Sequence, residues 1–314
     1  MQPNFISIPI GYTFSFNESL WFLNRNFDDC LHSVSTNLVR KALLINNKPL
    51  LLEIAQKNDS LQIEILSGDY QNENESEISA YIIEWLDLDR DVSPFYKLLD
   101  NDERLSYMTL SFAGLRLVGI PDLFEALCWG IIGQQINLTF AYKLKRRLVE
   151  KYGTQMEFEN EAYHIFPSCE VLAKADLQDL KAMQFSSKKA EYIIGLAQIF
   201  TDGKLSKGIL KLLPDVAARQ KALTSIKGIG VWTANYALMK CLKEQTSIPY
   251  GDTGLMQALF THQIIEHKKD YAPVEKFFTN FEGWESYLVF YLWRSLAKND
   301  QLDNSSKGQI DSAF

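Results

Sequence analysis

The chain has 314 residues, a formal net charge of −7 and a pI near 5.3. Hydrophobic residues make up 46% of it, which is enough to form one large or two modest globular domains. The acidic total excludes a protein that coats nucleic acid by bulk charge, although it leaves room for a basic surface on one side.

Residues 1–95 carry the alternating apolar pattern of β-strands, interrupted by turn residues such as those at 46–49. This pattern predicts an antiparallel sheet with two helices packed on it. The expected strands are 6–10, 42–45, 50–54 and 61–66, and the expected helices are 19–30 and 76–86.

From about residue 91 the pattern becomes helical, with capping residues before apolar runs, so we predict an all-α bundle over 96–298. The fold class is therefore α+β. Residues 299–314 are polar and lack periodicity, and we expect a flexible tail there. The main expected helices are 123–132, 138–152, 171–175, 188–201, 214–224, 231–243, 253–267 and 284–296.

The four cysteines are far apart and form no CxxC pair, which argues against zinc or an iron–sulfur cluster and predicts thiols in a reducing compartment. The N-terminus lacks the pattern of a signal peptide, and no apolar run is long enough to cross a membrane. We therefore expect a cytoplasmic protein. The cysteines are Cys30, Cys128, Cys169 and Cys241.

The most informative segment is 226–234, with the sequence IKGIGVWTA. Gly228 and Gly230 predict a tight hairpin between two helices, because glycine adopts backbone conformations that are closed to other residues. The free N–H groups at the start of the second helix can bind an anion such as a DNA phosphate. A GxG pair alone is a weak signal, and a plain helix connection is about as frequent.

Asp252 stands at the start of the next predicted helix, where the common role of an aspartate is to cap the free N–H groups. A carboxylate held in this way is also rigid, which suits a catalytic group. Cleavage of an N-glycosidic bond develops positive charge on the sugar, and a fixed carboxylate stabilises that charge and can orient a water.

Aromatic side chains accompany this carboxylate. Trp232 and Tyr236 are four residues apart on one helix face, and Trp293 lies in the last predicted helix. Aromatic residues at helical spacing more often belong to a core, but their faces would also attract a cationic alkylated purine. Between two other predicted helices, Gln135 or Ile136 could fill the gap that an extruded nucleotide leaves.

At these residues the chain resembles the helix–hairpin–helix superfamily of DNA glycosylases, and most closely the DNA-3-methyladenine glycosylase II branch. The segments 133–136, 180–191 and 286–293 look like the family's wedge loop, the stretch before its hairpin and its last helix. The resemblance implies a flipped-base mechanism on double-stranded DNA, with Asp252 as the catalytic carboxylate. It places Trp232, Tyr236 and Trp293 in the lesion pocket and Gly228, Gly230, Val231, Thr233, Gln134, Gln135 and Ile136 on the DNA.

The resemblance also implies a monovalent cation, sodium or potassium, on the backbone carbonyls of Ile226 and Gly228. No cofactor is required. Bifunctional relatives have a lysine where this chain has Trp232, so we do not expect strand cleavage. Lys227 replaces a proline common in the hairpin and Gly251 replaces a second acidic residue, so the range of lesions stays open.

We therefore predict a monomeric, monofunctional glycosylase that excises alkylated bases from duplex DNA; in a bacterium it would associate with the nucleoid. Two alternatives remain. One is an enzyme of the same fold for oxidised or deaminated bases. The other is a protein that binds damaged DNA without cutting the glycosidic bond.

Overall fold

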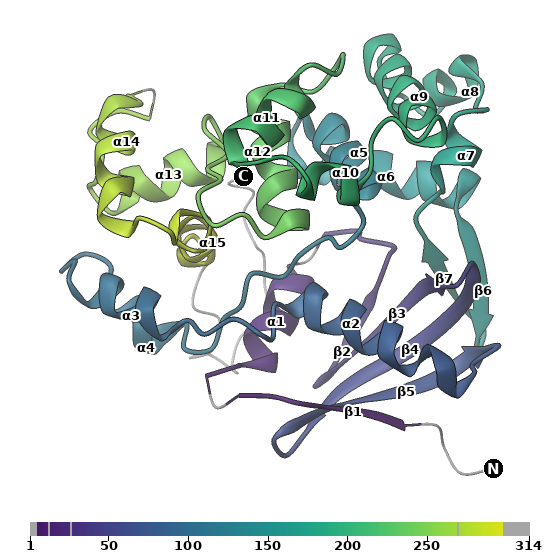
Figure 1. Ribbon diagram of the computed structural model, residues 1–314, viewed down its shortest axis with the longest axis horizontal. Helices are drawn as coiled ribbons and strands as arrows, with labels where there is room; N and C mark the ends of the chain where they lie inside the picture. The colour runs from purple at the N-terminus through teal and green to yellow at the C-terminus, as the bar shows by residue number, and fades with distance from the viewer. Residues whose placement is uncertain (1–4, 12, 26, 269, 298–314) are drawn as a thin grey trace, which may run out of the picture.

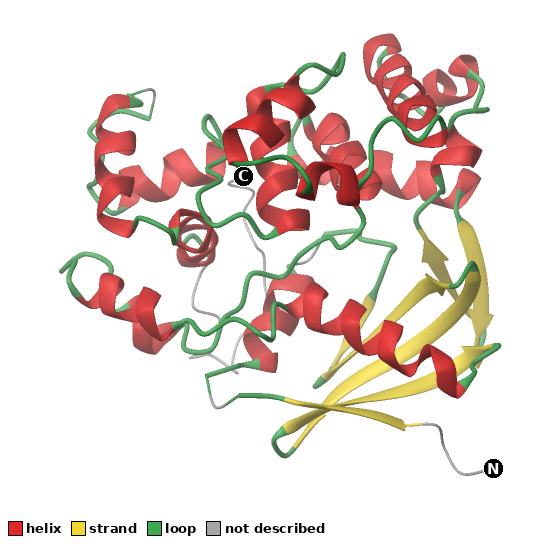
Figure 2. Ribbon diagram, viewed as in Figure 1, coloured by secondary structure: helices red, strands yellow, loops and turns green. Residues whose placement is uncertain are grey.

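The structure, a computed structural model, describes residues 5–11, 13–25, 27–268 and 270–297, and in it a β-sheet is followed by helices (Figures 1 and 2). The predicted α+β class is confirmed. Across the described ranges, no helix combines the length and the apolar character needed to cross a bilayer. The predicted tail, 299–314, lies outside the described residues.

The N-terminal sheet has five antiparallel strands in the order β1-β5-β4-β3-β2. The turn between β3 and β4 consists of Asn46 and Asn47, whose φ angles are 51° and 61°. Two successive left-handed residues are typical of a type I′ hairpin, and asparagine tolerates them. The strands are β1 (Phe5–Pro9), β2 (Ser33–Ser35), β3 (Leu38–Ile45), β4 (Lys48–Lys57) and β5 (Ser60–Gly68).

Two helices flank this sheet. α2 (Glu75–Leu86) buries Ile78 and Ile82 in the same core as the sheet residues. α1 (Phe16–Leu23) differs from the predicted helix at 19–30, because Ser15 caps it earlier, at the N–H of Glu18, and it ends at Leu23. The chain after α1 is therefore free to run as a loop toward the helical part of the protein.

The rest of the chain is mainly helical, as predicted, and its helices gather above the sheet in the view of Figure 2. The helices are α3 (Ser93–Asp100), α4 (Met108–Ser111), α5 (Leu123–Gly133), α6 (Leu138–Tyr152), α7 (Cys169–Leu172), α8 (Leu177–Ala182), α9 (Ser187–Thr201), α10 (Lys207–Lys211), α11 (Val216–Thr224), α12 (Val231–Ala237), α13 (Thr253–Thr261), α14 (Ala272–Phe278) and α15 (Glu285–Ser295). Shorter turns are η1 (Asn72–Asn74), η2 (Leu238–Leu242) and η3 (Thr279–Phe281).

Three local predictions in this half were wrong. A β-hairpin, β6 (Thr154–Phe158) and β7 (Glu161–Ile165), interrupts the predicted all-α segment, and its apolar side chains pack on Ala42 and Leu51 of the sheet. The helix predicted at 231–243 changes into the π-helical turn η2 after Ala237. The helix predicted at 253–267 ends at Thr261.

Two apolar cores hold the fold together. One lies among α5 to α12. The other joins the sheet, α2 and α3 to α13, α14 and α15, so the end of the chain packs against its beginning. The predicted division at residue 95 stays a prediction.

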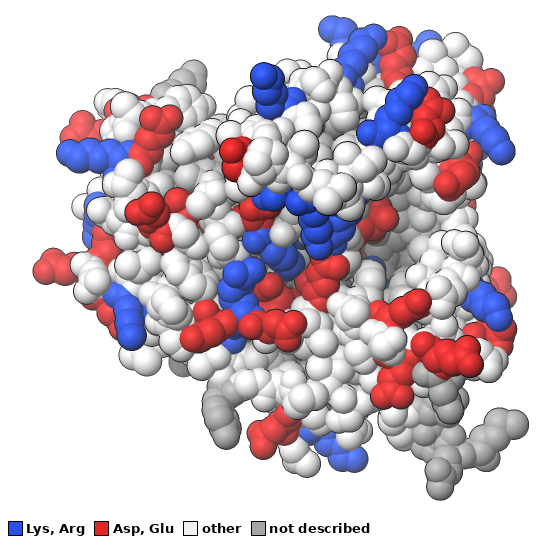
Figure 3. All heavy atoms as spheres, viewed as in Figure 1, with Lys and Arg blue, Asp and Glu red and all other residues white. Residues whose placement is uncertain are grey.

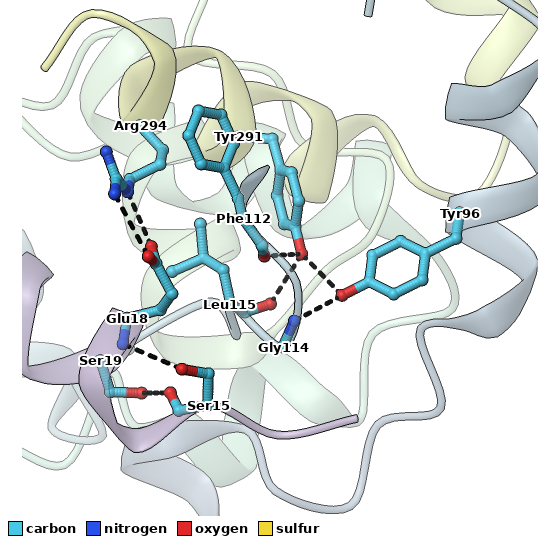
Figure 4. A network of polar contacts seen from close by, with 9 residues as sticks. All are labelled: Ser15, Glu18, Ser19, Tyr96, Phe112, Gly114, Leu115, Tyr291 and Arg294. Carbon is cyan, nitrogen blue, oxygen red and sulfur yellow. Dashed lines mark hydrogen bonds and ion pairs between the residues drawn. The ribbon is translucent and has the colours of Figure 1, made fainter. Parts of the chain in front are cut away.

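The second core is reinforced by polar contacts between α1 and α15, which Figure 4 shows from close by. Arg294 of α15 donates two hydrogen bonds to Glu18 of α1, and the hydroxyl of Tyr291 donates to the carbonyl of Leu115 at 3.0 Å. These contacts fix α15 against the N-terminal part of the chain. On the surface drawn in Figure 3, lysine and arginine side chains alternate with acidic ones, so that face is not uniformly basic.

Candidate active site

Asp252 is the N-cap of α13, as predicted. Its Oδ1 accepts hydrogen bonds from the backbone N–H of Leu255 at 2.8 Å and from Nε1 of Trp293 at 2.9 Å. Its Oδ2 accepts a longer one, 3.3 Å, from Nε1 of Trp232. The carboxylate is thus held by a helix start and by two indole rings from α12 and α15.

The surroundings of Asp252 act on its charge in opposite directions. Burial raises the pKa of this carboxyl, because the charged form loses water, while the hydrogen bonds from Leu255, Trp293 and Trp232 lower it. The net result is a raised pKa. The residue as a whole is nevertheless not fully buried, so part of its surface stays accessible.

The three predicted pocket aromatics lie together beside this carboxylate. The rings of Trp232 and Tyr236 are stacked, with centroids 5.4 Å apart and planes 22° apart, and the ring centroids of Tyr236 and Trp293 are 6.4 Å apart. The hydroxyl of Tyr236 accepts a hydrogen bond from Nε1 of Trp129 at 3.1 Å. The structure therefore brings Asp252 and all three aromatics into one site.

Gly254 permits the close approach of Trp293 to Asp252. A Cβ atom at this position would lie 3.2 Å from Oδ1 of Asp252 and 3.3 Å from Cδ1 of Trp293. Both separations are tighter than ordinary van der Waals contact, so the carboxylate or the indole would have to shift.

If Asp252 is the catalytic carboxylate that the resemblance implies, Gly254→Ala should slow base release about tenfold, because small displacements of such a group are costly, while the protein stays folded. Single-turnover rates and thermal unfolding would measure the two effects. Gly195→Ala is the matched control, because a Cβ there meets nothing within 4 Å and alanine favours a helix. An unchanged rate for Gly254→Ala would show that this approach is not needed.

The glycine hairpin has the predicted form. Gly228 has a φ of +94°, and a Cβ there would lie 2.3 Å from Cγ of Tyr192, so no larger residue fits. Gly230 is the N-cap of α12 without a capping side chain, and the following Val231 is half exposed. The first N–H groups of α12 are thereby left for an external partner.

Gln134 ties the wedge loop to this hairpin. Its Nε2 donates to the carbonyl of Gly228 at 2.9 Å and to Oγ1 of Thr233 at 3.1 Å. Thr233 is buried, and its methyl group contacts Gly130 of α5. The side chains of Gln134 and Thr233 therefore hold elements in place, and a contact of Thr233 with DNA would use its backbone.

The two wedge candidates differ in exposure. Gln135 is exposed and has a φ of 57°, a strained conformation for a residue other than glycine. Ile136 is partly buried and packs against the helical core. The geometry favours Gln135 as the side chain that can enter a duplex.

The carbonyls predicted to hold a cation already have partners inside the protein. The oxygen of Ile226 accepts from the N–H of Ile229 at 3.0 Å, and that of Gly228 accepts from Gln134. Each oxygen keeps one lone pair, but two half-used carbonyls do not supply the several oxygens that a cation needs. The cation stays a prediction, and no step below depends on it.

Several residues near the site gave no signal in the sequence. Asn235 spans two elements, accepting from Gln220 and donating to the carbonyl of Ile248, and thereby positions the loop before Asp252. Trp129 lies in a helix that is apolar on all sides, which hides its role. Phe22 and Arg25 come from the far end of the chain, and only the fold shows their position.

Family models match almost the whole chain. Residues 12–127 match the 8-oxoguanine DNA glycosylase N-terminal domain, and residues 128–282 match the HhH-GPD superfamily of base excision DNA repair proteins. A DNA-3-methyladenine glycosylase of Bacillus subtilis (strain 168) is 37% identical over 294 residues, covering 93% of this chain and 97% of that protein. The chain belongs to the DNA-3-methyladenine glycosylase family of this superfamily. It is thus a DNA glycosylase of base excision repair.

Solved structures share the fold of this family member. A 3-methyladenine DNA glycosylase from Archaeoglobus fulgidus has a TM-score of 0.80 at 22% identity, covering 96% of this chain and 99% of that one. An 8-oxoguanine glycosylase/lyase from Clostridium acetobutylicum has a TM-score of 0.73 at 17% identity, covering 93% and 96%. At these identities the likeness establishes the fold alone.

Proposed function

We propose that this glycosylase is monofunctional and hydrolyses the N-glycosidic bond of alkylated bases, such as 3-methyladenine, in duplex DNA. The observation that carries the proposal is the carboxylate of Asp252, fixed between a helix start and two indole N–H groups beside three aromatic rings. The name of the Bacillus subtilis relative supports the same substrate class.

The hydrogen bonds of Asp252 indicate which of its oxygens does the chemistry. Oδ1 accepts two bonds, whereas Oδ2 accepts one long bond and keeps a lone pair for the substrate. Oδ2 would face the sugar, stabilise the positive charge that develops as the base leaves, and orient the attacking water. An alkylated purine leaves readily, so no strong general acid is needed.

The other predicted residues supply binding. The N–H groups at the start of α12 would hold a phosphate, and Gln135 would occupy the gap in the duplex. Trp232, Tyr236 and Trp293 would stack on the extruded base, each stacking contact contributing roughly 1–3 kcal/mol. Trp232 occupies the place of the lysine in bifunctional relatives, so no Schiff base forms at this position and the product is an abasic site.

The test is base release from purified protein. Duplex DNA methylated in bulk is incubated with the enzyme, and free 3-methyladenine is identified by chromatography. Release without strand nicking supports the proposal. A covalent enzyme–DNA adduct formed when borohydride is present during the reaction contradicts the monofunctional assignment, because borohydride traps a Schiff base between the enzyme and the abasic sugar. Tight binding to an abasic-site analogue without release of any base would instead favour a damage-binding protein.

The match of residues 12–127 to an 8-oxoguanine glycosylase domain favours a second candidate, an enzyme for oxidised or deaminated bases. A panel of duplexes with one lesion each separates the two by their rates. We further propose that the protein acts as a monomer in the compartment that holds the genome, without a cofactor. Sedimentation of the enzyme alone and with duplex measures its oligomeric state.

A further inference from the structure

The aromatic wall beside Asp252 continues into the N-terminal part of the chain. On one side, the ring of Trp293 lies 6.3 Å from that of Phe290, which lies 4.7 Å from that of Phe22 just before the end of α1. The rings of the site and the ring of an N-terminal residue thus form one wall.

A second line of aromatics closes the opposite side. Trp129, which donates to the hydroxyl of Tyr236, lies 4.7 Å from Tyr142 between ring centroids. Tyr142 in turn stacks on Phe27 at 4.9 Å, with ring planes 9° apart. Both walls therefore lead from Tyr236 to the loop that follows α1.

Arg25 lies in the space between these walls. Its Cζ is 3.9 Å from the ring centroid of Phe22 and 5.7 Å from that of Phe27, and its Nε donates to the carbonyl of Phe22 at 2.9 Å. Tyr142 and Tyr236 line the same cavity as Arg25, and its positive charge opposes the rise in pKa that burial causes in both hydroxyls.

A cavity of about 70 Å³ is lined by Arg25 and Tyr236 together with the aromatic residues Phe22, Phe27, Trp129 and Tyr142. Three lysines also line it. Burial lowers the pKa of Lys41, and its amine donates to the carbonyl of Leu31 at 3.2 Å. Lys145 is paired with Asp29 at 2.6 Å. Burial holds the pKa of Lys240 well below its ordinary value, and its amine donates to the carbonyl of Val118. Among the described residues lining the cavity, Arg25 is therefore the permanent cation without a carboxylate at ion-pair distance.

The positive charge of Arg25 affects which bases the cavity can accept. The cavity that Tyr236 shares with Phe22 and Phe27 already holds a guanidinium over those two phenyl rings, and two cations in one enclosure repel each other. The terminal NH₂ groups of an arginine, by contrast, match the O6 and N7 acceptors of a neutral purine. A deaminated adenine, hypoxanthine, has both acceptors.

We propose that Arg25 is a specificity-determining residue that extends excision to neutral purines presenting O6 and N7, and slows excision of cationic alkylated purines. The proposal rests on the proposed glycosylase function. Arg25 would approach the base from the N-terminal loop, through the cavity that it shares with Tyr236.

The experiment compares single-turnover release from a duplex with one hypoxanthine and from a methylated duplex that yields 3-methyladenine. Arg25→Met keeps an apolar stem and removes the charge. We expect the ratio of the hypoxanthine rate to the 3-methyladenine rate to fall about tenfold or more, the discrimination that a bidentate arginine contact provides. Arg25→Lys should restore part of the ratio.

The control is Arg104→Met, because Arg104 is paired with Asp102 outside the cavity and should leave the ratio unchanged. Equal losses on both duplexes would mean that Arg25 only supports the fold, and an unchanged ratio would mean that it does not sense the base; either result overturns the proposal. If the wild-type protein releases 3-methyladenine in these runs, the glycosylase function stands whatever the ratio. If it releases neither base, the proposed glycosylase function is wrong, and the proposal about Arg25, which rests on it, is wrong as well.

Discussion

Replacing Asp252 with asparagine is expected to slow base release by about 10²- to 10³-fold, the usual effect of removing one preorganised electrostatic group from an active site. Asparagine can still cap α13 and accept from Trp293 through Oδ1, so the position of the side chain should survive, although its NH₂ group cannot accept the long hydrogen bond from Trp232. What disappears is the negative charge facing the sugar. Single-turnover release of 3-methyladenine measures the effect.

The same substitution should leave the fold as stable as before, or stabilise it. Burial raises the pKa of Asp252 in the folded protein, so ionising it opposes folding. The resulting loss in the free energy of unfolding is absent below the ordinary pKa of aspartate. It grows as the pH rises through the raised pKa of Asp252 in the folded protein. Urea unfolding at several pH values should therefore show the advantage of Asp252→Asn increasing with pH over this window.

The rate of base release by the wild-type enzyme should rise over the same pH range in which its stability falls. If the ionised carboxylate is the active form, the rate falls as pH drops through its raised pKa, while the residual rate of Asp252→Asn lacks this step. Asp176→Asn is the matched control, since Asp176 caps α8 in the same way outside the site. A wild-type rate in Asp252→Asn would refute the catalytic role of the carboxylate.

Local signals in the sequence were enough to predict much of this site. The glycine hairpin, the capping aspartate and the pair Trp232 and Tyr236 depend on backbone conformations and on helical spacing, which short segments determine. The position of Asp252 beside Trp232 followed from the resemblance to a family. The structure adds that both indoles donate to the carboxylate.

Contacts between distant segments could not be predicted in this way. The hairpin of β6 and β7 is polar on one side and becomes a stable element because Tyr163 and Ile165 pack on the sheet. Likewise, the pattern around Arg25 predicted a continuing helix, and no periodicity indicates that this loop reaches Tyr236. The side of the pocket contributed by the N-terminal segment therefore depends on tertiary packing alone.

The ion pair between Glu18 and Arg294 is the strongest candidate for holding that side in place. Nε of Arg294 donates to Glu18 at 2.7 Å (Figure 4). The guanidinium also lies 4.0 Å from the ring centroid of Trp21. Both side chains are nearly buried, with 8% and 14% of their surface exposed. The pair joins α1, which carries Phe22 and ends two residues before Arg25, to α15, which carries Trp293.

We expect Glu18→Gln to destabilise the protein by about 3–5 kcal/mol, because it leaves the buried guanidinium of Arg294 without a counter-charge. That is a large share of the roughly 5–15 kcal/mol that folded domains possess. Urea unfolding measures the loss. The double variant Glu18→Leu with Arg294→Met should recover most of it, since neither charge is then buried alone.

The two variants also separate stability from positioning. Assayed at a temperature where both are folded, the double variant keeps an apolar contact between α1 and α15 but loses the directional hydrogen bonds that set their register. Its rate on hypoxanthine, which on our proposal depends on Arg25, should fall more than its rate on 3-methyladenine. If the rates on the two bases fall by the same factor relative to the wild-type protein, the ion pair serves only to hold the fold together.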